Sequence, residues 1–307
     1  MKITASGGQP IRRAAPEGDT TGASPGAPAG RTAGPAVRPV GAKPPRRGPG
    51  RVKVLSLQLL VVVVLAGLWQ LLSVRGTLPG IYVSRPTSIV VALYHGFADG
   101  SLTAALGVTM YETVAGFAIA TVAGILGGMA LYESPLLERV SRPFLTAANN
   151  MPRLALTSLF VLWLGVGSSA HIVLVVTMVF FVVLLNTYSG FSSCDRDYLL
   201  LAKVLGASRW KLFASFLFPA AVPAIFVGLQ LGLTYSFMGA VIGEIITGGS
   251  GLGALIATYA ATYDSAKVFA DLLLIGIVAT ALSGLIKVVE SRLLGWRRHE
   301  LRGLVKN

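Results

Sequence analysis

The stretch HIVLVVTMVFFVVLLNTYSG, residues 171–190, contains no Lys, Arg, Asp or Glu. A helix of about 20 residues is long enough to cross the ~30 Å hydrocarbon core of a bilayer. The rest of the chain is similar in character, because 53% of its 307 residues are hydrophobic, only 13% are charged and its mean hydropathy is +0.70. Such a composition is typical of a membrane protein and excludes an ordinary soluble domain.

Five further apolar stretches accompany this one, and each is long enough to span a membrane as a helix. We therefore expect an all-α, polytopic membrane protein with about six transmembrane helices. The third stretch is interrupted by Asn149, Asn150, Pro152 and Arg153, so it is either a simple crossing or a broken helix that lines a pathway. The expected spans are 54–73, 108–131, 143–164, 171–190, 220–246 and 268–289.

The positive charges predict the orientation of these spans. The tail up to Lys53 holds ten Lys and Arg residues, and the alternating segments 132–142, 192–219 and 287–307 hold two, four and six. The opposite segments hold only three, at Arg75, Arg85 and Lys267. By the positive-inside rule, both termini are expected in the cytoplasm and the protein in the inner membrane.

Composition also predicts the domain organisation. The first fifty residues hold ten of the 36 glycines and nine of the 16 prolines, without any apolar period. Such a segment cannot bury enough surface to offset its ordering entropy, so 1–53 is expected to be a disordered, basic cytoplasmic tail that contacts lipid headgroups. We expect a first transmembrane helix and external linker over 54–80, a core transmembrane domain over 81–296 and a cytoplasmic C-terminal tail over 297–307.

Several kinds of chemistry are not indicated. The single cysteine, Cys194, excludes an intrachain disulfide, and the three histidines, His95, His171 and His299, lack metal-ligand spacing. No Walker A motif, zinc-protease motif or nucleophile motif occurs, and the basic residues follow membrane topology rather than one folded face. We therefore expect no catalytic residue, no metal, no cofactor and no nucleic-acid partner. A membrane enzyme is the less favoured alternative.

Small residues recur at intervals of four in three of the expected spans. Lipid provides no hydrophobic drive for helix association, so small residues stabilise a bundle by letting backbones approach closely. These stripes predict tight packing, either within one subunit or across a dimer. They comprise Gly116, Ala120, Gly124 and Gly128 in the second span, Gly228, Gly232, Ser236 and Ala240 in the fifth, and Gly276, Thr280 and Gly284 in the sixth.

The segment 195–219 between the fourth and fifth spans is too patterned for a simple connector. Asp195 is placed to cap a short helix, Gly206 suits the left-handed residue that ends it, and Ser208 is placed to cap a second helix before Pro219. The alternative is an interfacial helix that lies among the headgroups. The apolar face of the first helix consists of Tyr198, Leu201, Ala202 and Leu205.

The spacing within this segment resembles the cytoplasmic signature of permease subunits of ATP-binding cassette (ABC) importers, specifically the nitrate, sulfonate and taurine branch. Leu200 and Leu201 replace the opening Glu-Ala of that signature, while Ala202, Gly206 and Pro219 match it. The resemblance runs from about 86 to 296. It also includes Gly116-Phe117, Pro152, the segment 162–167, Gly206-Ala207-Ser208, Glu244 and Gly251-Leu252-Gly253.

This resemblance implies the type I importer permease fold, known as MetI-like, and a permease homodimer. It also implies a separate ABC ATPase that binds the ATP, an extracytoplasmic solute-binding protein, and a small anionic solute such as a sulfonate, taurine or nitrate. Thiamine-precursor pyrimidines are the alternative solutes. The coupling helix would lie within 195–219 and meet the ATPase in helix-in-groove fashion. Its residues are Tyr198, Leu200, Leu201, Ala202, Gly206, Ala207, Ser208 and Pro219.

Polar residues at membrane depth are the candidates for a translocation pathway, because ionisable side chains there are costly unless they face protein or water. Arg153 is expected either to pair with Glu112 or Glu244 or to give an anion pathway positive potential. A purely structural ion pair is the simpler interpretation. A secondary, ion-coupled transporter that uses the two glutamates as proton sites is the alternative function. The candidates are Glu112, Asn150, Pro152, Arg153, Ser236 and Glu244.

Overall fold

The computed structural model describes residues 51–75, 83–194, 204 and 206–293. Within these residues the chain is helical and contains no strand, which confirms the all-α class. Contacts divide the chain into two units, Met1–Lys53 and Val54–Asn307. Both predicted tails lie almost wholly outside the described residues, as does the expected first helix of the coupling segment, with Tyr198, Leu200, Leu201 and Ala202.

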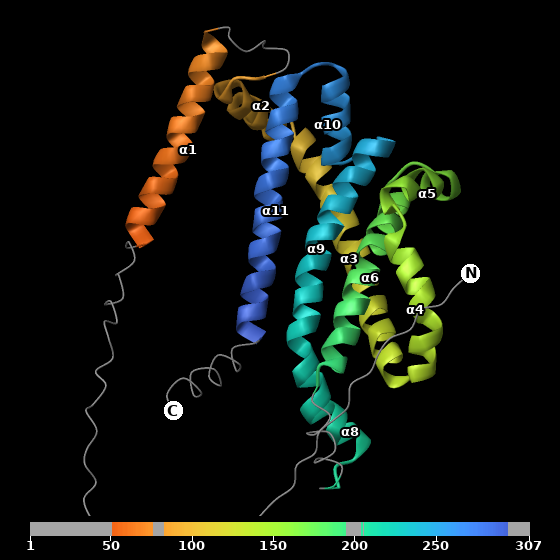
Figure 1. Ribbon diagram of the computed structural model, residues 1–307. Helices are drawn as coiled ribbons and strands as arrows, with labels where there is room; N and C mark the ends of the chain where they lie inside the picture. Colours follow the sequence, from red (N-terminus) through yellow and green to blue (C-terminus); the bar gives the residue numbers. More distant parts are fainter. Residues whose placement is uncertain (1–50, 76–82, 195–203, 205, 294–307) are drawn as a thin grey trace, which may run out of the picture. The chain divides into compact units, whose positions relative to one another are not determined.

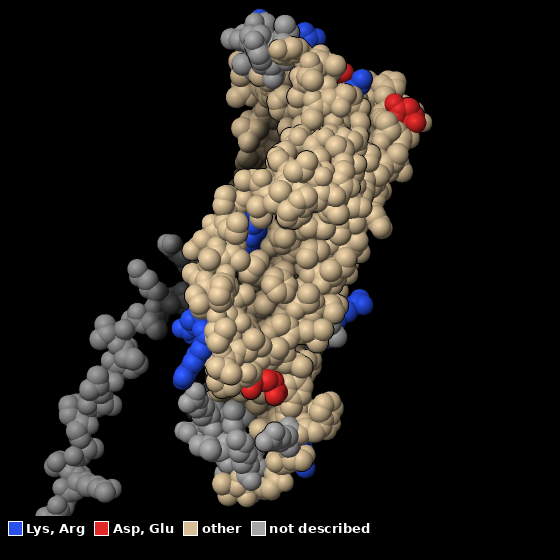
Figure 2. Space-filling view, turned by 90° about the vertical axis from the view of Figure 1, so that its right-hand side faces the viewer, with Lys and Arg blue, Asp and Glu red and all other residues tan. Residues whose placement is uncertain are grey.

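Among the residues that the structure describes, five helices are long and apolar enough to cross a membrane. Figure 2 shows one face of the molecule on which most charged side chains gather toward the two ends and the middle is almost entirely uncharged. This distribution suits a bilayer, because charged side chains in the hydrocarbon region are costly. The five helices, seen in Figure 1, are α1 (Arg51–Val74), α3 (Ser101–Glu133), α6 (Ser168–Ser192), α9 (Phe218–Thr247) and α11 (Ser265–Leu293).

The third expected crossing is not a single helix. It is divided into α4 (Pro135–Asn150), a 3₁₀ turn (Arg153–Leu156) and α5 (Thr157–Leu164). Met151 adopts an extended conformation before Pro152, as the steric demand of a following proline favours, and so ends α4. Figure 1 shows that α4 and α5 together return the chain from the end of α3 to the start of α6. The expectation of a simple crossing over 143–164 is therefore wrong, and the broken-helix alternative describes this segment.

Short helices mark the two ends of the bundle. In Figure 1, α2 and α10 lie at one end, which we call the α10 end, and α8 lies at the other, the α8 end. α8 continues through one π-helical turn into α9, where the proline at position 219 has no N–H to donate. The bounds are α2 (Pro86–Ala98), α8 (Arg209–Leu212), the π turn (Phe213–Leu217) and α10 (Leu252–Ala261).

Helix α6 packs along both α3 and α9 and forms the centre of the bundle. Val175, Val179 and Val183 of α6 are fully buried. A Cβ at Gly124 of α3 would lie 2.9 Å from Cβ of Val183, and one at Gly232 of α9 would lie 3.0 Å from Cγ1 of Val179. The stripes predicted for these two spans therefore pack inside the subunit.

The glycine stripe of α11 is different. A Cβ added at Gly276 or Gly284 would meet nothing within 4 Å among the described residues. This stripe makes no close contact within the described part of the subunit.

Candidate functional site

Five polar side chains meet at the α10 end of α3, α6 and α9, and we call them the polar cluster. Four of them expose 1% or less of their surface, and the fifth, that of Thr247, is partly buried. Buried ionisable groups need partners, so the contacts of the two glutamates are informative. The members are Thr109 and Glu112 of α3, His171 of α6, and Glu244 and Thr247 of α9.

Glu244 connects α9 to the start of α10. Its Oε1 accepts a hydrogen bond of 2.8 Å from the Thr109 hydroxyl, and its Oε2 accepts one of 2.7 Å from the backbone N–H of Gly253. The Thr109 hydroxyl oxygen in turn accepts a 2.9 Å bond from the N–H of Leu252. Both N–H groups belong to the first turn of α10, and the first N–H groups of a helix have no carbonyl acceptor within that helix. Glu244 and Thr109 thus cap α10 from two other helices.

Glycine is required where α10 begins. Gly251 has φ +114°, which L side chains rarely adopt, and a Cβ at this position would overlap the Glu244 carboxylate. A Cβ at Gly253 would overlap the carbonyl oxygen of Val241. The Gly-Leu-Gly sequence therefore lets the backbone approach a buried carboxylate closely.

Glu112 and His171 form the second half of the polar cluster. Glu112 Oε1 lies 3.0 Å from His171 Nδ1, and His171 Nε2 lies 2.6 Å from Thr247 Oγ1. Which atom donates in each contact depends on the tautomer of the imidazole. The His171 ring thereby bridges Glu112 of α3 to Thr247 of α9.

The two halves of the polar cluster share the same helices, since Thr109 and Glu112 both belong to α3 and Glu244 and Thr247 both belong to α9. Both residues were predicted as pathway residues, and the structure places both inside protein. What the cluster does in this geometry is to hold α3, α6, α9 and α10 together at the α10 end. Their proposed contact with solute remains a prediction.

Arg153 does not pair with either glutamate. Its Nη1 donates to the carbonyl of Met178 at 3.2 Å, its Nη2 donates to the side chain and carbonyl oxygens of Asn149, and its Cζ lies 5.1 Å from the centre of the Phe181 ring. All these partners are neutral. The expected ion pair with Glu112 or Glu244 is therefore wrong, because the break at Pro152 turns the guanidinium toward the middle of α6 instead.

The remaining pathway candidates are scattered. Asn150 is exposed at the end of α4, and Pro152 precedes the 3₁₀ turn. Ser236 is fully buried, and its hydroxyl donates to the carbonyl of Leu233 within α9. These three residues therefore share no single site in the described structure.

The described part of the coupling segment matches two local expectations. Gly206 has φ +77°, the left-handed conformation predicted for it, and Ser208 Oγ accepts from the N–H of Lys211 at 3.3 Å as a helix cap. The ring of Phe213 stacks on that of Phe191 at 5.8 Å and so braces this segment against α6. Ala207 precedes the cap, and the predicted Pro219 lies in the first turn of α9. Contact with an ATPase is still a prediction.

Three residues of the polar cluster were missed from the sequence, namely Thr109, His171 and Thr247. Thr109 precedes Glu112 by three positions and shares its helix face, which was a usable signal. His171 appeared only as an isolated histidine at the start of an apolar stretch. Among the described residues, no three His, Cys, Asp or Glu side chains are grouped so as to hold a metal ion.

Known proteins are similar to this chain in sequence and in fold. SsuC, a putative aliphatic sulfonates transport permease protein of Bacillus subtilis, is 28% identical over 253 residues, covering 82% of this chain and 92% of that protein. The formylaminopyrimidine transport permease protein ThiX of Halalkalibacterium halodurans is 30% identical over 185 residues, covering 60% and 74%. The crystal structure of an amino acid ABC transporter matches with a TM-score of 0.55 at 15% identity, covering 65% of this chain and 97% of that one.

The solved structure shows the fold, and it is that of an ABC importer permease, as expected. Residues 120–295 also match the family model described as binding-protein-dependent transport system inner membrane component. This match covers the broken third crossing, the centre of the bundle and the polar cluster except Thr109 and Glu112. The chain therefore belongs to this family of inner-membrane components and is a permease subunit of an ABC importer.

Proposed function

We propose that this permease imports a small anion of the sulfonate, taurine or nitrate type. It would work as a homodimer whose subunits have both termini in the cytoplasm. Its partners would be an ATPase that hydrolyses the ATP and an extracytoplasmic solute-binding protein. The similarity to SsuC over most of its length supports the solute class, and the excess of Lys and Arg supports the orientation. The similarity to ThiX favours a formylaminopyrimidine as the second candidate.

One observation carries the choice of an anion. Arg153 contacts Met178, which lies near the middle of α6, and its partners in the structure are a carbonyl, an amide, and an aromatic ring. An arginine keeps its charge in a protein, and no carboxylate among the described residues forms an ion pair with it. The break between α4 and α5 therefore presents positive charge at membrane depth, which suits an anion and disfavours a cation.

Replacing this charge tests the proposal. Arg153→Gln is expected to leave assembly with the ATPase intact and to lower uptake of the anion at least tenfold, while Arg153→Lys retains an intermediate rate because its charge remains. Uptake would be measured in proteoliposomes with a loaded binding protein, and assembly by size-exclusion chromatography. Arg142→Gln is the matched control, since Arg142 is exposed and paired with Glu138. Unchanged uptake by Arg153→Gln would remove the argument for an anion.

A second experiment tests coupling to the ATPase. Ala202→Pro is expected to abolish the stimulation of ATP hydrolysis by the loaded binding protein, because proline breaks a helix, whereas Ala202→Ser preserves it. If stimulation survives Ala202→Pro, the coupling helix lies elsewhere. Offering the binding protein an alkanesulfonate, taurine, nitrate or formylaminopyrimidine in turn would identify the solute class.

A further inference from the structure

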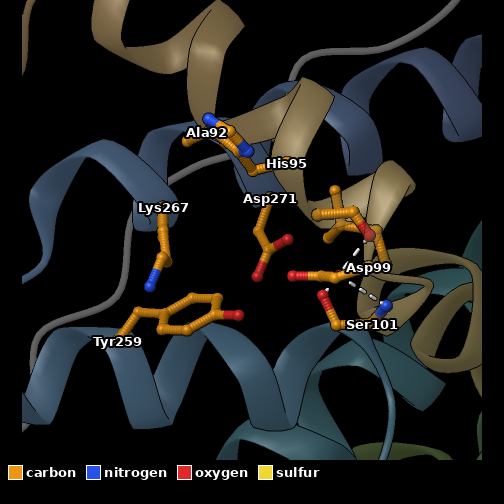
Figure 3. Close-up of a pocket in the computed structure, with 10 residues that line it drawn as sticks. Ala92, His95, Asp99, Ser101, Tyr259, Lys267 and Asp271 are labelled. Atoms are coloured by element: carbon orange, nitrogen blue, oxygen red, sulfur yellow. Dashed lines mark hydrogen bonds between the residues drawn. The ribbon is translucent and has the colours of Figure 1, made fainter.

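A separate polar pocket lies at the α10 end, between α2, the start of α3, α10 and α11. Its volume is about 150 Å³. Figure 3 shows that side chains from all four helices point into it. The residues that matter for its chemistry are His95, Asp99, Ser101, Tyr259, Lys267 and Asp271. None of them belongs to the polar cluster or to the expected pathway.

Asp271 is the unusual member. Its side chain is fully buried, and neither carboxylate oxygen has a hydrogen-bond partner among the described residues. A buried carboxylate without partners is strongly unfavourable, so such a group marks a place where something else binds. In Figure 3 its oxygens point toward the Tyr259 hydroxyl and the Asp99 carboxylate. Asp271 is thus aimed into the pocket.

The charges around the pocket favour a cation. Asp99 accepts a 2.9 Å hydrogen bond from the N–H of Ser101, and the hydrogen bonds from Ser101 hold the pKa of Asp99 below its usual value, so it is ionised. The one lysine that lines the pocket, Lys267, is already paired with Asp264 at 3.2 Å and lies over the Tyr259 ring. Within the described residues, no cation forms an ion pair with either of the two carboxylates that face the pocket.

The type of cation follows from the donors and the space. The described residues contain no group of three His, Cys, Asp or Glu side chains that could hold a metal ion, which argues against a divalent metal. A primary ammonium carries three N–H donors, enough for both free oxygens of Asp271 and one further acceptor. The pocket has roughly five times the ~30 Å³ that one water occupies, which leaves room for an ammonium with a short alkyl group.

We infer that this pocket binds a primary ammonium group, with the two oxygens of Asp271 as its main acceptors and either Asp99 or the Tyr259 hydroxyl as the third. The group can belong to a free amine or to a lysine of a docked protein. Lys267 is the internal competitor, because it precedes Asp271 by four residues on the same helix and can reach the same face.

Methylammonium is a direct probe. The purified permease with its ATPase, in nanodiscs, would be unfolded thermally in methylammonium chloride, tetramethylammonium chloride or sodium chloride at equal ionic strength. A bound ligand stabilises the folded state, so methylammonium alone is expected to raise the midpoint by about 2–4 °C. Asp271→Asn should abolish this rise and Asp99→Asn should reduce it. Glu290→Gln, at the other end of α11, is the matched control and should keep it.

Other outcomes would overturn the inference. An equal rise with sodium would indicate a general site for monovalent cations, and no rise with any salt would indicate no site at all. If methylammonium acts only on Lys267→Gln, the pocket is filled by the chain's own lysine and takes no external ligand. The source of the ammonium is tested by adding the solute-binding protein. If methylammonium competes with docking of the binding protein, the ammonium group is a lysine of that protein. If the two do not compete, the group belongs to a free amine.

Discussion

The glycine faces of α3 and α11 look alike in sequence and differ in what they meet. On α3, a Cβ at Gly128 would lie 2.7 Å from the carbonyl oxygen of Leu184 and 2.7 Å from Cβ of Thr187. On α11, a Cβ at Gly276 or Gly284 would meet nothing within 4 Å in the described part of the chain. Small residues every four positions therefore indicate a surface that permits close approach. Whether another helix packs against that surface is determined by the fold.

The largest expected effect on stability is at the glycine face of α3, which packs against α6. Gly128→Leu would force α3 away from α6 against a backbone carbonyl, which cannot move aside as a side chain can. We expect a loss of about 3 kcal/mol or more in stability, at the upper end for overpacked cores. The measurements are the yield of monodisperse protein and its thermal midpoint. If Gly128→Leu and Gly276→Leu proved equally harmful, the difference between the two faces would vanish.

Glycine also permits close approach at the start of α10, where the neighbour is the Glu244 carboxylate. Glu244→Ala would leave the N–H of Gly253 and the hydroxyl of Thr109 without their acceptor, at an expected loss of about 2–4 kcal/mol. Glu244→Gln should recover part of this, because one oxygen remains while its amide N–H₂ opposes the other donor. Thermal unfolding with the exposed Glu133→Ala as control measures both. Full stability of Glu244→Ala would show that α10 is held by other contacts.

The smallest expected effect on stability is at the glycine face of α11. Gly276→Leu should change the stability of the isolated subunit by no more than about 0.5 kcal/mol, the usual range for surface positions, because the added side chain meets open space. The same variant in the complete transporter sharpens the contrast. Unchanged assembly there would mean that lipid covers this face, whereas lost assembly would mean that a second protein surface packs against it.

Much of the fold could be predicted from the sequence, because hydropathy and turn chemistry are local. The long helices, the left-handed Gly206 and the cap at Ser208 follow from residues close to one another in the chain. The broken crossing at Pro152 was indicated as an alternative, since proline acts on its immediate neighbours.

The partners of buried charges could not be predicted in the same way. Arg153 was expected opposite a glutamate, and its side chain instead binds Asn149 and Met178. The Glu112 side chain contacts that of His171, which lies 59 residues further along the chain. Such pairs depend on how helices rotate about their axes in the bundle, and no local pattern specifies that rotation. Asp271 lies within the expected span 268–289, so its charge was a usable signal that was missed, whereas its burial arises only where four helices meet.

The contact between Glu112 and His171 also has an electrical consequence. Moving a proton between Nδ1 and Oε1 would displace charge by no more than the 3.0 Å that separates these atoms. One elementary charge that crosses a whole core of ~30 Å gains about 2.3 kcal/mol per 100 mV, so this displacement is worth at most about 0.2 kcal/mol. The membrane voltage therefore leaves the link between α3, α6 and α9 essentially unchanged, whether the cell is energised or not.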